Sequence, residues 1–458
     1  MGFWDAAFSL SATQFIFLMI ALLVAFGFEF INGFHDTANA VTTVIYTKSM
    51  TPRNAVLYSG FLNFVGVLVG GTGVAFGIVN LLPVERLVGE SQNTALVMVL
   101  SMLIAAVIWN LGTWYVGLPV SSSHTLIGSI IGVGIAHGWL SEHDLHGVRW
   151  DKAIETGLAL LLSPVLGFLV AGGLLLLLKM FFPDKRLYEP PADDGFPPGW
   201  VKWAIRLTCG GVSFAHGSND GQKGMGLLML VLVGFLPALY ALHPSDKTST
   251  QAIVQSAADI QARVPKDEEK AAKAKEANEK LRADFALIAE KLSSVDALAD
   301  VHPEDRWKLR QAITRISKHP AAEKNEKKVL DSAVQYIPLW VVVMTALCLG
   351  VGTTVGYKRI VVTVAEKIGK THLTYAQGAA AEFVAMCTIL LAVIYKLPVS
   401  TTHVLSSGVA GTMAANKNGL QAAMVKKILL AWVFTLPACI ALSGLLFTIG
   451  WKMTGQGQ

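Results

Sequence analysis

Two aspartates inside apolar runs carry the strongest chemical signal in this sequence. Asp36 lies in the segment GFHDTANA (33–40), and Asp220 lies in the segment GSNDGQKG (217–224). Laid over each other without gaps, at an offset of 184 positions, the two segments align these aspartates. A carboxylate inside an apolar run is costly unless it faces a cavity or a partner, so both are candidates for binding a coupling ion or a metal. The alternative is a structural hydrogen bond between helices.

Further polar residues extend this candidate site for a coupling ion or metal. His35 and Asn219 directly precede the two aspartates, and Glu382 lies within a later apolar run. Glu29 lies in an apolar run too and is a functional-site candidate on the same argument. Because carboxylates repel anions, we expect the acids to carry a proton or another cation, or a metal that arrives with an anion. For Glu29 and Glu382, a structural hydrogen bond stays an alternative.

A second pair of matching segments supplies hydroxyl groups. LPVSSSH (118–124) reappears as LPVSTTH (397–403), at an offset of 279 positions. Hydroxyls and backbone N–H groups at helix N-termini are the donors that an oxyanion needs inside a membrane. Each cluster alone would be read as an ordinary N-cap, but the repetition in both halves predicts an anion site. The candidate anion-binding residues are Asn39, Ser121, Ser122, Ser123, Lys223, Ser400, Thr401 and Thr402.

Each basic side chain in these motifs has two possible roles. Lys223 offers positive charge to an anion, or it serves only as the counter-ion of Asp220. His35, His124, His216 and His403 are candidate proton relays or ligands, and His124 and His403 occupy matching positions in the two halves. The alternative for each of these histidines is a buried structural role.

The composition places these motifs in a membrane protein. Of the 458 residues, 53% are hydrophobic and 15% are charged, and the mean hydropathy of +0.51 is too high for an average soluble domain. The net charge of +5 is spread over loops, without a basic stretch interleaved with aromatics, so nucleic acid is not an expected partner. The four cysteines have no CxxC spacing, so we expect neither disulfides nor thiolate metal sites.

Apolar runs long enough to span a bilayer predict an all-α integral membrane protein with about 10 to 12 transmembrane helices. The higher number applies if runs that contain the motifs fold as half-helices or hairpins. We expect the glycine-containing aspartate segments to break their helices. Lysine and arginine lie mainly in alternate short loops, and this topology runs the first copy of each motif opposite to the second. The prediction is two inverted-topology repeats with broken helices or helical hairpins at the midplane.

The two offsets differ by 95 residues, and one polar segment of about that length lies between the second and fourth motifs. We therefore predict a duplicated unit with one insertion. Repeat 1 covers residues 1–182, a connecting loop covers 183–202, and repeat 2 covers 203–241 and 336–458. The insertion, 242–335, is polar and expected to be helical, with an amphipathic helix at about 266–291. We interpret it as a solvated cap, with a regulatory or docking module as the alternative.

These motifs resemble those of the inorganic phosphate transporter (PiT) family, over the whole chain except the insertion. GFHDTANA (33–40), HGSNDGQKG (216–224) and STTHVLSS (400–407) look like the low-affinity proton-coupled phosphate transporters of Gram-negative bacteria. The resemblance implies that a neutral divalent metal–phosphate complex moves together with a proton. The sodium-coupled branch typically has Asn at the positions of His35 and Lys223, and Glu at the positions of Asn63 and Glu382.

We therefore expect a multi-pass secondary active symporter of the bacterial inner membrane. It is not expected to be an enzyme, because no zinc-ligand spacing, Gly-x-Ser-x-Gly elbow or nucleotide loop is present. The expected partners are inorganic phosphate, protons, divalent metal ions such as Mg, Ca or Zn, and the lipid bilayer, with a homodimer left open. No cofactor is expected to stay bound, since the metal would travel with phosphate. A sulfate permease, a sodium-coupled phosphate symporter and an anion channel are the alternatives.

Overall fold

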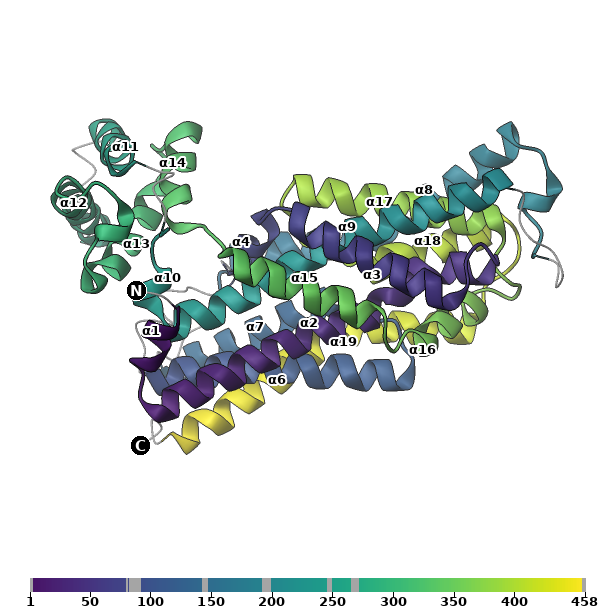
Figure 1. Ribbon diagram of the computed structural model, residues 1–458, viewed down its shortest axis with the longest axis horizontal. Coiled ribbons are helices and arrows are strands. Elements are labelled where there is room, and N and C mark those ends of the chain that lie inside the picture. Colours follow the sequence, from purple (N-terminus) through teal and green to yellow (C-terminus); the bar gives the residue numbers. More distant parts are fainter. Residues whose placement is uncertain are drawn as a thin grey trace. The chain divides into compact units, whose positions relative to one another are not determined.

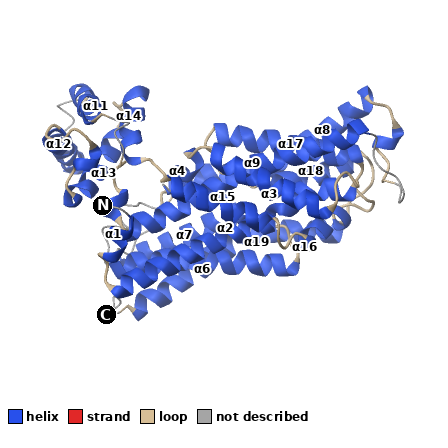
Figure 2. Ribbon diagram, viewed as in Figure 1, coloured by secondary structure: helices blue, strands red, loops and turns tan. Residues whose placement is uncertain are grey.

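The structure is a computed structural model that describes residues 3–79, 81, 92–141, 147–191, 199–244, 249–264 and 272–454, without the side chains of Asn39, Gln92 and 272–277. These residues form helices and loops, with no β-strand among them (Figure 2). The chain divides into two compact units. The smaller unit contains Met1–Phe17 and Leu232–Pro338, and the larger unit contains Leu18–Val231 and Leu339–Gln458.

The larger unit contains the motifs. Its helices are α2 (Ala12–Tyr46), α3 (Pro52–Val69), α4 (Gly73–Val79), α6 (Gln92–Val116), α7 (Ser122–Ser141), α8 (Trp150–Phe181), α9 (Gly199–Phe235), α15 (Leu339–Thr353), α16 (Lys358–Val362), α17 (Tyr375–Ile394), α18 (Thr401–Ala415) and α19 (Ala422–Met453) (Figure 1). Most of α2 and most of α9 belong to this unit, and the rest of each belongs to the smaller one.

The predicted membrane fold is confirmed by the length and apolar character of these helices. In the described part of the chain, five helices are individually long and apolar enough to cross a membrane, namely α2, α6, α8, α17 and α19, and there are up to seven spans if each of two bent helix pairs counts as one. Large apolar side chains stay exposed along α8, such as Leu161 at 66% and Leu169 at 63%. Such exposure fits a surface that faces lipid chains rather than water.

The duplication is visible in the packing of the larger unit. Helix α7 packs against α19, and its counterpart α18 packs against α8. In the same way α6 contacts α7 and α19, while α17 contacts α18 and α8. In Figure 1, α2, α6 and α8 run in one direction along the unit, and α9, α17 and α19 run in the opposite direction. The structure therefore consists of two inverted repeats that exchange their packing partners.

The aspartate segments differ from the prediction that they break their helices. Both α2 and α9 continue as unbroken helices through Asp36 and Asp220. The glycines serve close approach instead: a Cβ on Gly33 would lie 2.4 Å from the carbonyl oxygen of Leu349, and a Cβ on Gly217 would lie 2.1 Å from that of Asn63. A break does occur after α3, where α3 and α4 are bent by 77°.

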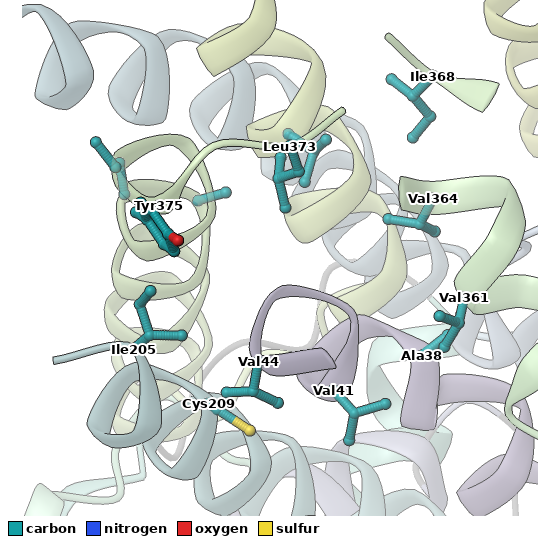
Figure 3. Packing of buried hydrophobic residues seen from close by; sticks show 14 of the residues in the cluster. Ala38, Val41, Val44, Ile205, Cys209, Val361, Val364, Ile368, Leu373 and Tyr375 are labelled. Carbon is teal, nitrogen blue, oxygen red and sulfur yellow. The ribbon is translucent and has the colours of Figure 1, made fainter. Parts of the chain in front are cut away.

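Apolar side chains that follow Asp36 hold this part of α2 in place. Ala38, Val41 and Val44 are buried in a cluster that also contains Ile205 and Cys209 of α9 and residues of α16 and α17 (Figure 3). Such packing limits the movement of the backbone that carries the aspartate.

The smaller unit has its own core. Its helices are α1 (Phe3–Phe8), α10 (Pro237–Tyr240), α11 (Thr250–Arg263), α12 (Ala272–Leu292), α13 (Pro303–Ser317) and α14 (Lys324–Val334). Ile260, Ile288 and Ile313 are buried together, and Arg315 binds Asp284 through two hydrogen bonds of 2.6 Å. The amphipathic helix predicted at about 266–291 corresponds to α12, and residues 266–271 of that prediction lie outside the described part.

The close contacts between helices can be tested by the stability of glycine-to-alanine variants. A Cβ on Gly411 of α18 would lie 2.1 Å from the carbonyl oxygen of Phe168 in α8, whereas a Cβ on Gly173 of α8 would meet nothing within 4 Å. Gly411→Ala should therefore separate two backbones and cost about 1–3 kcal/mol. Gly173→Ala should be neutral or slightly stabilising, because alanine favours helix. Thermal unfolding of the two detergent-purified variants tests this, and equal midpoints would contradict it.

Candidate functional site

Two helices bring three titratable side chains together in the larger unit. Asp36 comes from α2, and His216 and Asp220 come from α9, where a spacing of four residues places them on one helix face. The ligand atoms of these buried residues lie within 4.8 Å of one another. The Nε2 atom of His216 lies 3.5 Å from Asp36 Oδ2 and 3.5 Å from Asp220 Oδ2. We call this group the Asp–His–Asp centre.

The hydroxyl clusters meet at the same place. Ser122 Oγ lies within donating distance of Asp36 Oδ2 (3.2 Å) and Asp220 Oδ2 (3.4 Å), and Thr402 Oγ1 donates to Asp36 Oδ1. These two residues stand in the first turns of α7 and α18, so both positive helix ends are directed at the carboxylates. Ser121 and Ser400 serve as N-caps, accepting from the N–H groups of residues 124 and 403 at 3.2 and 3.1 Å.

Lys223 lies beside the Asp–His–Asp centre, and all three N–H donors of its ammonium group are used. It is 1% exposed, and its Nζ donates to Asp220 Oδ1 at 2.6 Å, to Ser123 Oγ at 2.5 Å and to the carbonyl of Val399 at 3.1 Å. An ammonium group has three N–H donors, so in this arrangement none is left for a substrate. An anion would have to replace one of these three acceptors.

The two repeats differ at this lysine. Thr402 and Ser123 are counterparts, as are Asp36 and Asp220. Thr402 donates directly to Asp36, whereas Ser123 reaches Asp220 only through the ammonium group of Lys223. A lysine side chain therefore lies on only one side of the pseudo-symmetric site, beside Asp220.

The orientation of His216 is set by a chain of hydrogen bonds. The Thr353 hydroxyl donates to the carbonyl of Leu349 at 2.8 Å, so it accepts from Asn63 Nδ2 at 3.0 Å. The other amide atom of Asn63, Oδ1, then accepts from His216 Nδ1 at 2.8 Å. Because Nδ1 carries the hydrogen, Nε2, which faces Asp36 and Asp220, has a free lone pair. It can bind a metal through its lone pair, or a proton that bridges the carboxylates.

The remaining candidates lie around the centre rather than in it. His35 Nδ1 is 3.6 Å from Asp36 Oδ1, and Asn219 Nδ2 donates to the carbonyl of Leu397 at 3.3 Å. Glu382 on α17 accepts from Thr208 at 2.6 Å. Thr401 is buried at the start of α18. Asn39 lies in α2, but its side chain is outside the described part of the structure.

The rings of the two candidate relay histidines are in contact, tilted by 35° to each other. The rings of His124 and His403 have centroids 4.6 Å apart, and the ring of His403 also stacks on Trp432 at 4.1 Å. These contacts join the N-terminal turns of α7 and α18 to α19.

Sequence reasoning named His216 as a candidate relay or ligand but did not place it between the two aspartates, and it did not assign Asn63 to the site. His216 gave a usable signal, since it precedes Asp220 by four residues within a helix. Asn63 stood out only as a position where the sodium-coupled branch typically has Glu, and its contact with His216, which is far away in the chain, arises only through the packing of α3 on α9.

The ion pair of Lys223 and Asp220 can be tested by stability. Lys223→Met leaves a buried carboxylate unpaired, which should cost about 3–5 kcal/mol and lower the unfolding temperature. Lys223→Met with Asp220→Asn removes both charges and should recover most of that loss. As a matched control, Lys152→Met affects a lysine that is 42% exposed and paired with Glu155, and it should change little. A double variant as unstable as the single one would rule out the pairing as the cause.

Comparisons with known proteins agree with the motifs and the fold. The PHO4 phosphate transporter family matches residues 32–443 of this chain. PitB and PitA, low-affinity inorganic phosphate transporters of Escherichia coli strain K12, are each 39% identical to it, with 96% and 94% of this chain and 97% and 96% of those proteins covered. A solved structure described as the sodium-dependent phosphate transporter has a TM-score of 0.57 at 24% identity, covering 95% of this chain and 98% of that one, and this supports the fold alone. The chain is a multi-pass plasma-membrane protein that belongs to the phosphate transporter family.

Proposed function

We propose that this protein is a secondary active symporter that imports inorganic phosphate, as a neutral divalent metal–phosphate complex, together with protons. The observation that carries the proposal is the Asp–His–Asp centre beneath two hydroxyl-bearing helix N-termini. Its relatives PitA and PitB are named as phosphate transporters.

Charge balance favours a metal complex over free phosphate. The Asp–His–Asp centre contains two carboxylates, and the lysine beside it, Lys223, is already paired with Asp220. A dianion would add to this negative charge in a low-dielectric site. A divalent cation held by two carboxylate oxygens and one imidazole nitrogen offsets that charge, and this ligand set suits a metal such as Zn or Mn.

The helix ends are suited to the phosphate part of such a complex. Ser122 and Thr402 donate to Asp36, and a metal bound to that carboxylate would compete for the same oxygen lone pairs. The released hydroxyls and the N–H groups of the first turns of α7 and α18 would then be donors for phosphate oxygens. Since α7 and α18 belong to different repeats, a tilt of one repeat against the other would change the side of the membrane from which phosphate can enter the site.

Uptake by purified protein in proteoliposomes tests the proposal. Labelled phosphate should accumulate above equilibrium under an inward proton gradient only when a divalent metal such as Zn or Mn is present, and it should leak out when a protonophore is added. Sulfate should not accumulate. Asp36→Asn and Asp220→Asn should each abolish uphill uptake in protein that still inserts.

Each alternative has its own signature in the same assay. Accumulation driven by sodium without a proton gradient would establish sodium coupling instead, and accumulation of sulfate would establish a sulfate permease. Phosphate flux that never exceeds equilibrium would indicate a channel.

The orientation of His216 provides a second test. Asn63→Leu removes the acceptor of the Nδ1 hydrogen and should weaken divalent metal binding about 10–100-fold, the usual effect of losing a partner that orients a metal ligand. Thr353→Val removes only the outer link and should have a smaller effect. Titration of the purified variants with Zn or Mn measures both affinities. Unchanged affinity in Asn63→Leu would show that the amide does not orient a metal ligand.

A further inference from the structure

The loops at one end of the larger unit are joined by hydrogen bonds. Tyr46 donates to the carboxylate of Glu366, and Gln421 Nε2 donates to the main-chain carbonyl of Glu366 at 3.1 Å. Asn416 Nδ2 donates to the carbonyl of Tyr188 at 3.2 Å. The four connections that meet here, after α2, α8, α15 and α18, are the short loops in which lysine and arginine are concentrated. By the positive-inside rule, this end lies at the cytoplasmic surface of the membrane.

A pocket of about 380 Å³ opens between the C-terminal end of α6 and residues 358–367, where α16 contacts α6 (Figure 1). We call it the basic pocket, because Lys358, Arg359 and Lys367 line it and no aspartate or glutamate is among its described lining residues. None of these three side chains forms an ion pair with an acid in the described part of the chain. The carboxylate next to Lys367 in the chain, Glu366, accepts from Tyr46. The basic pocket therefore has three positive charges without a counter-ion of their own.

Arg359 is held in the wall of this pocket by its neighbours. Its Nη1 donates to the carbonyl of Tyr115 at 2.6 Å, and its Cζ lies 5.1 Å and 4.8 Å from the ring centroids of Trp114 and Tyr115. Trp114 is fixed in turn, since its Nε1 donates to the carbonyl of Gly356 at 2.9 Å. A guanidinium group has five N–H donors in a planar fork that matches the oxygens of a phosphate. One contact with a carbonyl leaves the others for an anion.

The end of α6 is a fixed wall of the basic pocket. Gly117 follows the helix with a φ of +75°, a left-handed conformation that favours glycine and ends the helix. The N–H of Leu118 then donates back to the carbonyl of Thr113 at 3.0 Å. The carbonyl of Gly117 accepts from Thr363 Oγ1 at 2.8 Å. These bonds tie the end of α6 to the segment that carries the three basic side chains.

An exposed apolar face leads away from the basic pocket along α6. Ile104, Ile108 and Leu111 are 38%, 50% and 38% exposed, and Tyr115 is 69% exposed. Their spacing of four, three and four residues places them on one face of the helix. Because α6 is long and apolar enough to cross a membrane, this face contacts lipid chains. Tyr115 also lines the pocket, so the apolar face and the basic pocket are continuous.

We propose that the basic pocket binds the headgroup phosphate of an anionic phospholipid, whose acyl chains lie along the exposed face of α6. Basic pockets at the cytoplasmic side of membrane helices suit such headgroups. A zwitterionic headgroup would bring its own ammonium group next to the three cations and should bind less well. The apolar face favours a lipid over free phosphate, which has no chain to place there. This lipid site is distinct from the Asp–His–Asp centre and does not depend on how transport is coupled.

Lys358→Gln with Lys367→Gln tests the proposal, because this pair removes two charges from the pocket and leaves the contacts of Arg359 in place. Native mass spectrometry of detergent-purified protein counts the lipid bound during titration with phosphatidylglycerol or phosphatidylcholine. Wild type should bind one phosphatidylglycerol more tightly than phosphatidylcholine. The variant should lose about 30-fold in affinity for phosphatidylglycerol, which corresponds to about 1 kcal/mol for each lysine. Lys426→Gln with Lys427→Gln removes two exposed lysines of α19 outside the pocket and is the matched control.

The control pair should bind phosphatidylglycerol as wild type does, and both variants should unfold at the wild-type temperature because all four lysines are exposed. An equal loss of affinity in the two variants would overturn the proposal, since it would indicate general attraction to the positive end of the protein. Equal affinity of wild type for the two lipids would overturn it as well. Millimolar inorganic phosphate should not displace phosphatidylglycerol, and displacement would assign the basic pocket to free phosphate instead.

Discussion

Two carboxylates inside a membrane protein cannot remain without partners, and the arrangement of the larger unit follows from this constraint. Moving an ionised group out of water costs several kcal/mol unless opposite charge and hydrogen bonds compensate it. Asp36 and Asp220 obtain these partners from two other helices and from α9 itself, because Ser122 of α7, Thr402 of α18 and Lys223 of α9 all donate to them. The short helices α7 and α18 therefore begin where the carboxylates lie, and their positive ends add to the compensation.

The inverted repeat delivers these partners from both sides, but not symmetrically. Thr402 donates directly to Asp36, while its counterpart Ser123 reaches Asp220 through Lys223. This difference gives the site a single lysine charge, beside Asp220. A symmetric pair of aspartates would lack such an element.

Much of this could be read from the sequence, since it depends on local composition and on repetition. The apolar runs indicated a helical membrane fold, and matching segments at two offsets indicated duplication and the aspartates on which the centre is built. The aspartate segments were read incorrectly as helix breaks. Gly33 and Gly217 suggested flexibility, yet their role is to let α15 and α3 approach the backbones of α2 and α9. A glycine for close packing and a glycine for a break look the same in a sequence, because the difference lies in what the opposite helix presents.

The sequence by itself determined the membrane-embedded helical character of this protein, the doubling of its motifs and the chemical types of the residues in them, since these are properties of composition and of spacing along one chain. Only the tertiary structure decided which of these residues meet. His216 joins the two aspartates because Asn63 of α3 orients its ring. Lys223 binds Asp220 because the first turn of α7 and the segment just before α18 supply its other two acceptors. Such contacts join residues that are often more than one hundred positions apart. They depend on how closely whole helices approach one another, and that distance cannot be predicted from a local sequence pattern.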